Sequence, residues 1–264
     1  MHPLVNIAIK AARSASKISV RAQERVDQLE VTSKGLNDFV TEIDKQSEIE
    51  IIKIIHAAYP NHAILGEEGG ASGENDYTWI IDPIDGTTNF IHGHPHFSIS
   101  IAIQYKDKIE HGVIYDPLRQ ELFTASRGCG AFLNERRIRV SSRKNFEGSI
   151  IGIGYNNKRP QFLNTHLQMM ANITPHVAGI RRSGSAALDF AYTACGRLDA
   201  ACQMNISPWD MAAGVLLIKE AGGIVSDFDG GEDYLKTGNV MAANVKLLKL
   251  LMQSTLDKSS QEKD

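Results

Sequence analysis

The first sixty residues of the chain carry apolar side chains at helical spacing. Between residues 3 and 24 a broad apolar stripe consists of Leu4, Ile7, Ala8, Ala11, Ala12, Ala15 and Ile18. A second pattern, with Ile43, Ile51, Ile54 and Ile55, runs from Thr41 to Ala58 and stops at Tyr59-Pro60. Because apolar residues at i, i+3, i+4 and i+7 share one face of a helix, these patterns predict two amphipathic helices.

Short apolar runs separated by turn residues follow, and they predict strands. The predicted strands are Ala63 to Leu65, Thr78 to Ile81, Phe97 to Tyr105, Ile109 to Tyr115 and Glu121 to Thr124. Turns at Lys106-Asp107-Lys108 and Asp116-Pro117 join neighbouring strands. Since these strands follow one another without a helix between them, we expect an antiparallel or mixed sheet.

After about residue 140 the pattern changes to alternating helices and strands. Helices are predicted at 184–195 and 208–221, and strands at 200–204, 224–226 and 240–242. The chain therefore divides into an N-terminal α+β half, residues 1–140, and a C-terminal α/β half, residues 141–264. No long linker separates the halves, so we expect one compact unit. The polar tail 257–264 contains no apolar residue, and we expect it to be disordered.

The composition is that of an ordinary soluble globular protein. The 264 residues are 42% hydrophobic and carry a formal net charge of −3, which argues against a nucleic-acid binder held by global charge, although local basic patches stay possible. The three cysteines, Cys129, Cys195 and Cys202, lack metal-ligand spacing and are odd in number, so reduced thiols are favoured over a disulfide framework. We therefore expect a cytoplasmic protein without a signal peptide or membrane span.

The segment Asp82-Pro83-Ile84-Asp85-Gly86 ends an apolar strand abruptly with two carboxylates. Proline fixes φ at position 83, and glycine permits a sharp turn at 86, so both side chains can converge. Two anionic oxygen ligands on a rigid corner suit a hard cation such as Mg²⁺. The alternative is a solvated turn without a metal. The metal site is favoured over this alternative only if further acids elsewhere in the chain can join the two aspartates.

Two other acids meet that condition. Glu67 follows a short apolar strand, and it would join Asp82 and Asp85 at one rim if their strands lie side by side; alone, it would be a solvated loop acid. Asp210 follows Ser207-Pro208, an N-cap and first position typical of a helix. It could belong to the same site, or it could simply stabilise the start of its own helix.

Four separated motifs are similar, in order and spacing, to the signatures of the inositol monophosphatase family. They are Gly66-Glu67-Glu68, the segment from Asp82 to Phe90, Trp209-Asp210 and Glu220-Ala221-Gly222-Gly223. The resemblance covers nearly the whole chain and is closest to the bacterial SuhB-type members. It implies a layered α-β-α-β-α sandwich of the inositol monophosphatase and fructose-bisphosphatase type. It also implies a phosphatase that hydrolyses a phosphate monoester, above all myo-inositol monophosphate.

Carried over residue by residue, the resemblance implies a centre of two or three Mg²⁺ ions. Glu67, Asp82 and the main-chain carbonyl of Ile84 would hold a first ion. Asp82, Asp85 and Asp210 would hold a second. Such a centre suits a phosphate monoester, because one ion lowers the pKa of the attacking water and another stabilises the leaving oxygen.

The resemblance also implies which groups handle water and phosphate. Thr87, hydrogen-bonded to Asp44, would orient or deprotonate the attacking water, and the amides of Gly86 and Thr87 would contact phosphate oxygens. Lys34 matches a lysine at the outer edge of the metal cluster; by itself it would be a solvated charge. The implied catalytic residues are Asp44, Glu67, Asp85 and Thr87.

The substrate contacts include one departure from the family pattern. Gly184-Ser185-Ala186 begins a predicted helix, so its amides and hydroxyl can meet a polyol or phosphate oxygen; a plain helix cap is an equally good interpretation. Gln203 stands where the family commonly has a glutamate, and an amide lacks that charge. We therefore predict altered inositol recognition with an intact hydrolytic centre. The implied substrate-binding residues are Asp85, Gly86, Thr87, Gly184, Ser185, Ala186, Gln203 and Asp210.

A second functional class stays open beside the phosphatase. SuhB-type proteins are implicated in ribosomal RNA transcription antitermination, which implies RNA polymerase and antitermination factors as partners. The pair Arg181-Arg182 is a candidate surface for that role, or simply a solvated charged face. The resemblance further implies a homodimer and inhibition by Li⁺. Fructose-1,6-bisphosphate, 3′-phosphoadenosine 5′-phosphate or another sugar or polyol phosphate would be a substrate variant on the same centre.

Overall fold

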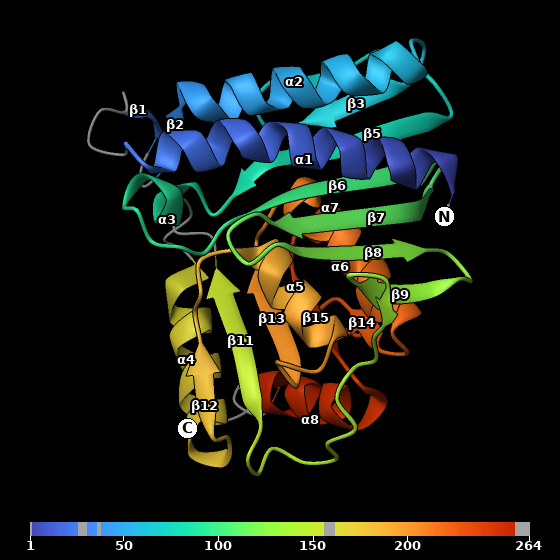
Figure 1. The fold of residues 1–264 in the computed structure, drawn as a ribbon. Helices are drawn as coiled ribbons and strands as arrows, with labels where there is room; N and C mark the ends of the chain where they lie inside the picture. Colours follow the sequence, from blue (N-terminus) through green and yellow to red (C-terminus); the bar gives the residue numbers. More distant parts are fainter. Residues whose placement is uncertain (1, 26–30, 36–37, 156–161, 257–264) are drawn as a thin grey trace.

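The computed structural model describes residues 2–25, 31–35, 38–155 and 162–256. Their helices and strands form five layers, in which two sheets alternate with layers of helices (Figure 1). This arrangement confirms the predicted α-β-α-β-α sandwich. The polar tail 257–264, for which disorder is predicted, lies outside the described residues.

The larger sheet is mixed and has eight strands. Most neighbouring strands are antiparallel, but β3 runs parallel to β5, with Gly66 opposite Ile81. All five strands predicted before residue 140 belong to this sheet. Its spatial order is β10 (Arg136–Arg137), β9 (Gly130–Leu133), β8 (Glu121–Ser126), β7 (Lys108–Asp116), β6 (Ser98–Tyr105), β5 (Tyr77–Asp85), β3 (Ala63–Gly66) and β4 (Gly70–Ser72).

Two antiparallel helices, α1 (Pro3–Gln23) and α2 (Glu42–Ala58), cover one face of the larger sheet (Figure 1). The small residues of α1, such as Ala8 and Ala11, belong to the same hydrophobic cluster as Trp79 and Ile81 of the larger sheet. The predicted apolar stripe therefore forms this contact, and alanine side chains let the helix approach the sheet closely.

The central layer consists of α5 (Ala186–Ala194) and α6 (Pro208–Glu220). Ile80 belongs to the cluster that contains these helices, whereas its neighbours Trp79 and Ile81 face the α1 side. Because successive residues of a strand point to opposite faces, burial of both faces explains the unbroken apolar run of β5. Helices from residues after 140 thus pack on a sheet built from residues before 140.

The smaller sheet has five strands and lies on the other side of the central layer. Its outer face is covered by α4 (Leu163–Ile173) and α8 (Val245–Leu256). Its order is β12 (Gly179–Arg181), β11 (Ile150–Tyr155), β13 (Ala200–Met204), β15 (Val240–Ala243) and β14 (Ile224–Ser226). The three strands predicted after residue 140 are all present.

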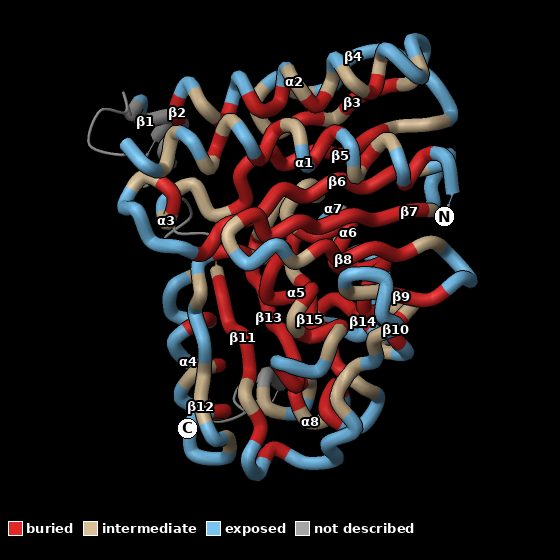
Figure 2. Tube along the Cα trace, viewed as in Figure 1, coloured by how far each residue is buried: buried red, intermediate tan, exposed pale blue. Residues whose placement is uncertain are grey.

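Shorter elements complete the fold. They are β1 (Val31–Gly35), β2 (Asp38–Thr41), α3 (Thr87–Ile91), η3 (Thr174–His176) and α7 (Tyr234–Thr237). Figure 2 shows that the strands between helix layers are buried, whereas the outer faces of α1 and α2 reach solvent. All three cysteines are free thiols, as predicted. Within the described ranges, none of the helices has the length and apolar character needed to span a membrane.

Candidate active site

The corner at the end of β5 has the predicted form. Asp82 and Asp85 are buried, and the pairing of β5 with β6 shifts register between them. The Ile84 amide donates to Asp82 Oδ1 at 3.0 Å, which tightens the turn. Gly86 has a φ of +102°, and a Cβ there would lie 3.2 Å from the carbonyl oxygens of Gly184 and His96. Glycine is therefore required at 86 both for its left-handed backbone and for the close packing around it.

Three carboxylates converge at this corner. Asp82, Asp85 and Asp210 each offer one oxygen, and these oxygens all lie within 4.8 Å of one another. Asp210 comes from the first turn of α6, where the Ser207 amide donates to its Oδ2 at 2.7 Å. The helix-cap interpretation of Asp210 is therefore confirmed, and its carboxylate also belongs to the three that converge; its role as a metal ligand stays a prediction.

Glu67 reaches the same rim because β3 and β5 are parallel neighbours, as the sequence argument required. Its amide donates to the Ile81 carbonyl at 3.1 Å, and its carboxyl group lies beside Asp82. Sequence reasoning missed Glu48, a buried residue of α2 that holds this acidic turn. Its carboxylate accepts the amides of Glu68 at 3.0 Å and Gly69 at 2.6 Å.

Burial and the closeness of the other acids change the pKa values of these carboxyl groups. Burial raises the pKa of Asp82 well above its usual range, and the neighbouring carboxylates of Glu67, Asp85 and Asp210 raise it further. Burial also raises the pKa of Asp85 to about 6, against the opposing effect of its hydrogen bonds. Adding a divalent cation would favour the charged form of each acid. The donor set consists of oxygen atoms, which fits Mg²⁺ or a similar hard cation.

Thr87 and Asp44 are in contact beside this cluster. The Thr87 hydroxyl lies 3.2 Å from Asp44 Oδ1 and 3.1 Å from the carbonyl oxygen of Ile84, so it can donate to either. The other Asp44 oxygen accepts the Thr41 amide at 2.9 Å and the Thr41 hydroxyl at 2.6 Å. Asp44 thus caps α2 with one oxygen and faces Thr87 with the other, and burial raises the pKa of its carboxyl group. The hydrogen bond implied by the resemblance is present; the roles of these residues in catalysis stay predictions.

The start of α5 surrounds Asp85 with donors. The Ser185 hydroxyl and the amides of Ala186 (3.2 Å) and Ala187 (2.9 Å) all donate to its carboxylate. Ser185 also accepts the Leu188 amide at 3.3 Å, so the helix-cap interpretation of Ser185 is confirmed. Because Asp85 takes these donors, a substrate contact by Ser185 or Ala186 stays a prediction. Gly184, by contrast, is exposed next to them.

The remaining predicted residues lie in different surroundings. Gln203 is buried, and its amide donates to Asp189 Oδ2 at 2.8 Å, a partner that sequence reasoning missed. No spacing in the sequence links these two residues. The side chain of Lys34, on β1, lies outside the part of the chain that the structure describes. Arg181 and Arg182 are exposed, and Arg182 lies over the Tyr155 ring at 5.4 Å from its centre.

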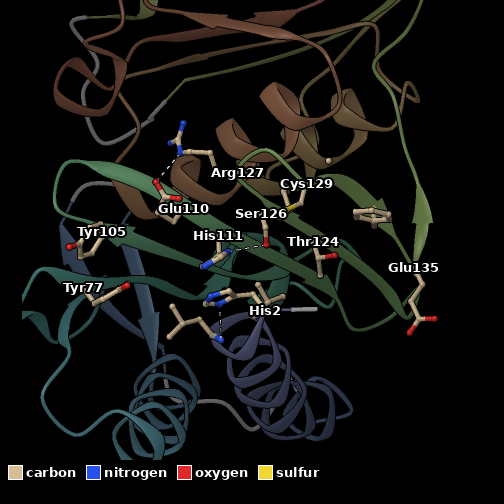
Figure 3. Close-up of a pocket in the computed structure, with 15 residues that line it drawn as sticks. His2, Tyr77, Tyr105, Glu110, His111, Thr124, Ser126, Arg127, Cys129 and Glu135 are labelled. Atoms are coloured by element: carbon tan, nitrogen blue, oxygen red, sulfur yellow. Dashed lines mark hydrogen bonds and ion pairs between the residues drawn. The ribbon is translucent and has the colours of Figure 1, made fainter.

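A separate cavity of about 740 Å³ lies between the start of α1 and strands β7 to β9 (Figure 3). His2 and His111 stack there with ring centres 4.3 Å apart, and His111 Nδ1 is 2.9 Å from the Ser126 hydroxyl. None of the predicted site residues lines this cavity. It is therefore distinct from the acidic corner.

Comparison with known proteins agrees with the geometry of this corner. The model of the inositol monophosphatase family matches residues 1–261. The chain belongs to the inositol monophosphatase family. Membership in this family identifies a phosphatase with a fold and an acidic cluster typical of metal-dependent members.

Individual members of the inositol monophosphatase family are similar over almost the full length. The Nus factor SuhB of Pseudomonas aeruginosa is 52% identical over 258 residues, which cover 96% of this chain and 95% of that protein. A crystal structure of the extragenic suppressor protein SuhB from Bartonella henselae has a TM-score of 0.94 at 41% identity and covers 97% of this chain and 100% of that chain. An inositol monophosphatase from Anabaena has a TM-score of 0.85 at 38% identity, with 95% and 94% covered.

Proposed function

We propose that the protein hydrolyses a phosphate monoester in a Mg²⁺-dependent reaction, with myo-inositol monophosphate as the leading substrate. The observation that carries this proposal is the convergence of Asp82, Asp85 and Asp210 within 4.8 Å. Glu67 and the Ile84 carbonyl would complete the ligands. When bound, two or three Mg²⁺ ions would supply positive charge that stabilises the attacking and leaving oxygens.

The residues around the cluster have separate tasks in this proposal. Thr87 and Asp44 form a hydroxyl–carboxylate pair that orients the attacking water and accepts its proton. The amides of Gly86 and Thr87 bind oxygens of the phosphate group. The water gives up a proton and adds to phosphorus, the ester P–O bond breaks, and the leaving oxygen takes up a proton, so that the products are a polyol and inorganic phosphate. Gly184 and Gln203 would contact the polyol.

A substrate panel tests the proposal. Purified protein is assayed with inositol, glycerol, sugar and nucleotide phosphates, with Mg²⁺, after EDTA treatment, and with added Li⁺. We expect activity that EDTA abolishes, Mg²⁺ restores and Li⁺ inhibits. Asp85→Asn and Asp210→Asn should each lower kcat/KM by about a hundredfold or more, because several kcal/mol of charge stabilisation depend on the ligand set. The exposed Asp107→Asn provides the control. Full turnover by Asp85→Asn and Asp210→Asn would contradict the proposal.

A second role is favoured by the relatives named Nus factor SuhB. We propose that the chain also associates with RNA polymerase and antitermination factors through the exposed Arg181 and Arg182, and that it forms a homodimer. A pull-down with purified factors should lose the complex for Arg181→Glu/Arg182→Glu. It should keep the complex for Asp85→Asn and for the control Lys246→Glu/Lys249→Glu. Wild-type protein that captures no factor would contradict this role, and light scattering of the same protein tests the dimer.

A further inference from the structure

A buried carboxylate and a buried amide meet close to the candidate active site. Asp189, in the first turn of α5, is 3% exposed, and Gln203, on β13, is 4% exposed. Gln203 Nε2 donates to Asp189 Oδ2 at 2.8 Å. Buried polar side chains are stable in a protein interior when their polar atoms are hydrogen-bonded. The hydrogen bond between Asp189 and Gln203 therefore determines how both side chains are oriented.

Two glycines of β11 leave the space that this pair occupies. Gly154 lies opposite Gln203 in the parallel pairing of β11 with β13. A Cβ on Gly154 would be 2.1 Å from Gln203 Oε1, and a Cβ on Gly152 would be 3.3 Å from Asp189 Cγ. The Gln203 side-chain amide therefore lies across the backbone of Gly154 on β11. Its position is fixed by the hydrogen bond to Asp189 and by packing against β11.

The same pair is connected to the acidic corner through one short loop. The Ser183 hydroxyl donates to the second oxygen of Asp189, and the Ser185 hydroxyl donates to Asp85. The Ser183 carbonyl oxygen accepts a hydrogen bond from the side-chain Nδ2 of Asn89 at 2.9 Å. The loop 183–185 is thus fixed between one aspartate of the corner and the aspartate that holds Gln203.

The chemistry of Asp189 decides which way the Gln203 amide points. Burial raises the pKa of Asp189 to about 7, so its carboxyl group is ionised above that pH. An ionised carboxylate only accepts hydrogen bonds, so Gln203 then faces it with its NH₂ group, as in the 2.8 Å contact. No donor in the described part of the chain reaches Gln203 Oε1, which leaves that acceptor for a ligand. A glutamate at 203 would instead place two carboxylates at hydrogen-bond distance, and such a pair has to share a proton.

We propose that Asp189 is a positioning residue for substrate selectivity, which fixes the Gln203 amide so that its Oε1 and free N–H bind hydroxyl groups of the leaving polyol. This inference rests on the proposed phosphatase function. The amide at 203 and the carboxylate at 189 then form one functional unit, in which a second carboxylate at position 203 would affect both residues.

The test compares two substrates that share the hydrolytic step. We would measure kcat and KM for myo-inositol 1-phosphate and for p-nitrophenyl phosphate, which has no polyol hydroxyls. The assays use saturating Mg²⁺ between pH 7.5 and pH 9.5, above the pKa of about 7 to which burial raises Asp189. Asp189→Leu should lower the ratio of kcat/KM values for these substrates about tenfold, through KM of the polyol, because one fixed hydrogen bond is lost. Asp189→Asn should keep the ratio, since its amide oxygen accepts from Gln203 and its NH₂ donates to Ser183.

The pH dependence supplies a readout that a merely structural role would not change. Gln203→Glu should make KM of the polyol substrate depend on pH, because the new pair of carboxylates shares a proton. The double variant Asp189→Asn/Gln203→Glu exchanges the positions of the carboxylate and the amide. It should remove the pH dependence of KM, because only one carboxylate is left in the pair. Thr193→Val is the matched control on α5, because the Thr193 hydroxyl bonds only the main-chain oxygen of Asp189, at 2.8 Å.

The outcomes separate this inference from the function on which it rests. Wild-type protein that hydrolyses neither substrate overturns the proposed function, and the inference with it. Wild-type activity on both substrates, with a ratio and a pH profile that Asp189→Leu and Gln203→Glu leave unchanged, overturns the inference alone. Asp189→Leu could fail to fold. In that case the pH dependence of KM for Gln203→Glu, compared with that of Asp189→Asn/Gln203→Glu, tests the inference, because both variants keep polar groups at positions 189 and 203.

Discussion

Gly214→Ala should destabilise the protein although alanine is the better helix former. Gly214 lies inside α6, where a Cβ would come within 2.4 Å of the Phe190 Cβ on α5. Ordinary contacts of a Cβ begin at 3.4 Å, so α5 and α6 would have to separate by about 1 Å. Rotation of the Phe190 side chain cannot relieve the clash, because its Cβ moves only with the backbone.

Two opposing free energies set the expected size of the effect. Alanine is favoured over glycine in a helix interior by about 1 kcal/mol. Overpacking a core costs about 1–3 kcal/mol. The upper end applies here, since α6 cannot retreat towards the larger sheet: a Cβ on Gly112 would already be 2.9 Å from the Ala213 carbonyl oxygen. We therefore expect a net loss of about 2 kcal/mol in the free energy of unfolding.

Urea unfolding followed by circular dichroism measures this loss. With a slope of roughly 3 kcal/mol per molar urea, the midpoint should fall by about 0.7 M. Gly179→Ala is the matched control, because its Cβ would meet only the end of the exposed Arg181 side chain, at 2.9 Å. An unchanged or higher midpoint for Gly214→Ala would refute the reasoning. Since α5 binds Asp85 and α6 carries Asp210, the Mg²⁺ requirement should rise in the same variant.

Two further predictions concern buried polar groups. Glu48→Gln should lower the free energy of unfolding by about 2 kcal/mol and weaken Mg²⁺ activation, because its new NH₂ group would face the amides of Glu68 and Gly69; unchanged values in urea unfolding and Mg²⁺ titration would count against this. Burial lowers the pKa of His111 to about 4, so between its ordinary value of 6.5 and pH 4 the unfolded chain binds a proton that the folded chain does not. Stability should therefore fall as pH falls through this window, by roughly 2 kcal/mol at pH 5 for this residue, which is 8% exposed. His111→Gln should lose that part of the pH dependence in paired unfolding curves at pH 7.5 and pH 5, and equal pH dependence would show that His111 does not contribute.

Local patterns determined much of this fold before any tertiary contact was known. The apolar stripes at 3–24 and 41–58 predicted α1 and α2, because helical periodicity is a property of neighbouring residues. Ser207-Pro208 likewise predicted the start of α6 and put Asp210 in its first turn. The Asp82 to Gly86 corner was recognisable for the same reason, since proline and glycine restrict the backbone where they stand.

Other features depended on which segments became neighbours. Glu48 precedes the acidic turn that it holds by 20 residues, and Ser185 follows Asp85 by 100 residues. The residues themselves were visible in the sequence, and Ser185 was predicted as a substrate contact or a helix cap, but not as a partner of Asp85. Its bond to Asp85 arises because α5 and β5 pack in adjacent layers.

The sequence by itself determined α1, α2, α5, α6, the strands predicted from apolar runs and the acidic corner, because each follows from the spacing and backbone preferences of consecutive residues. It did not predict α4, β11 or β12. The tertiary structure alone decided the partners of those residues. Gln203 looked like an isolated departure from the family pattern, whereas in the structure it is one half of a buried pair with Asp189, over a glycine of a neighbouring strand. A hydrogen bond between buried groups depends on distance and direction in space, and no local periodicity encodes either.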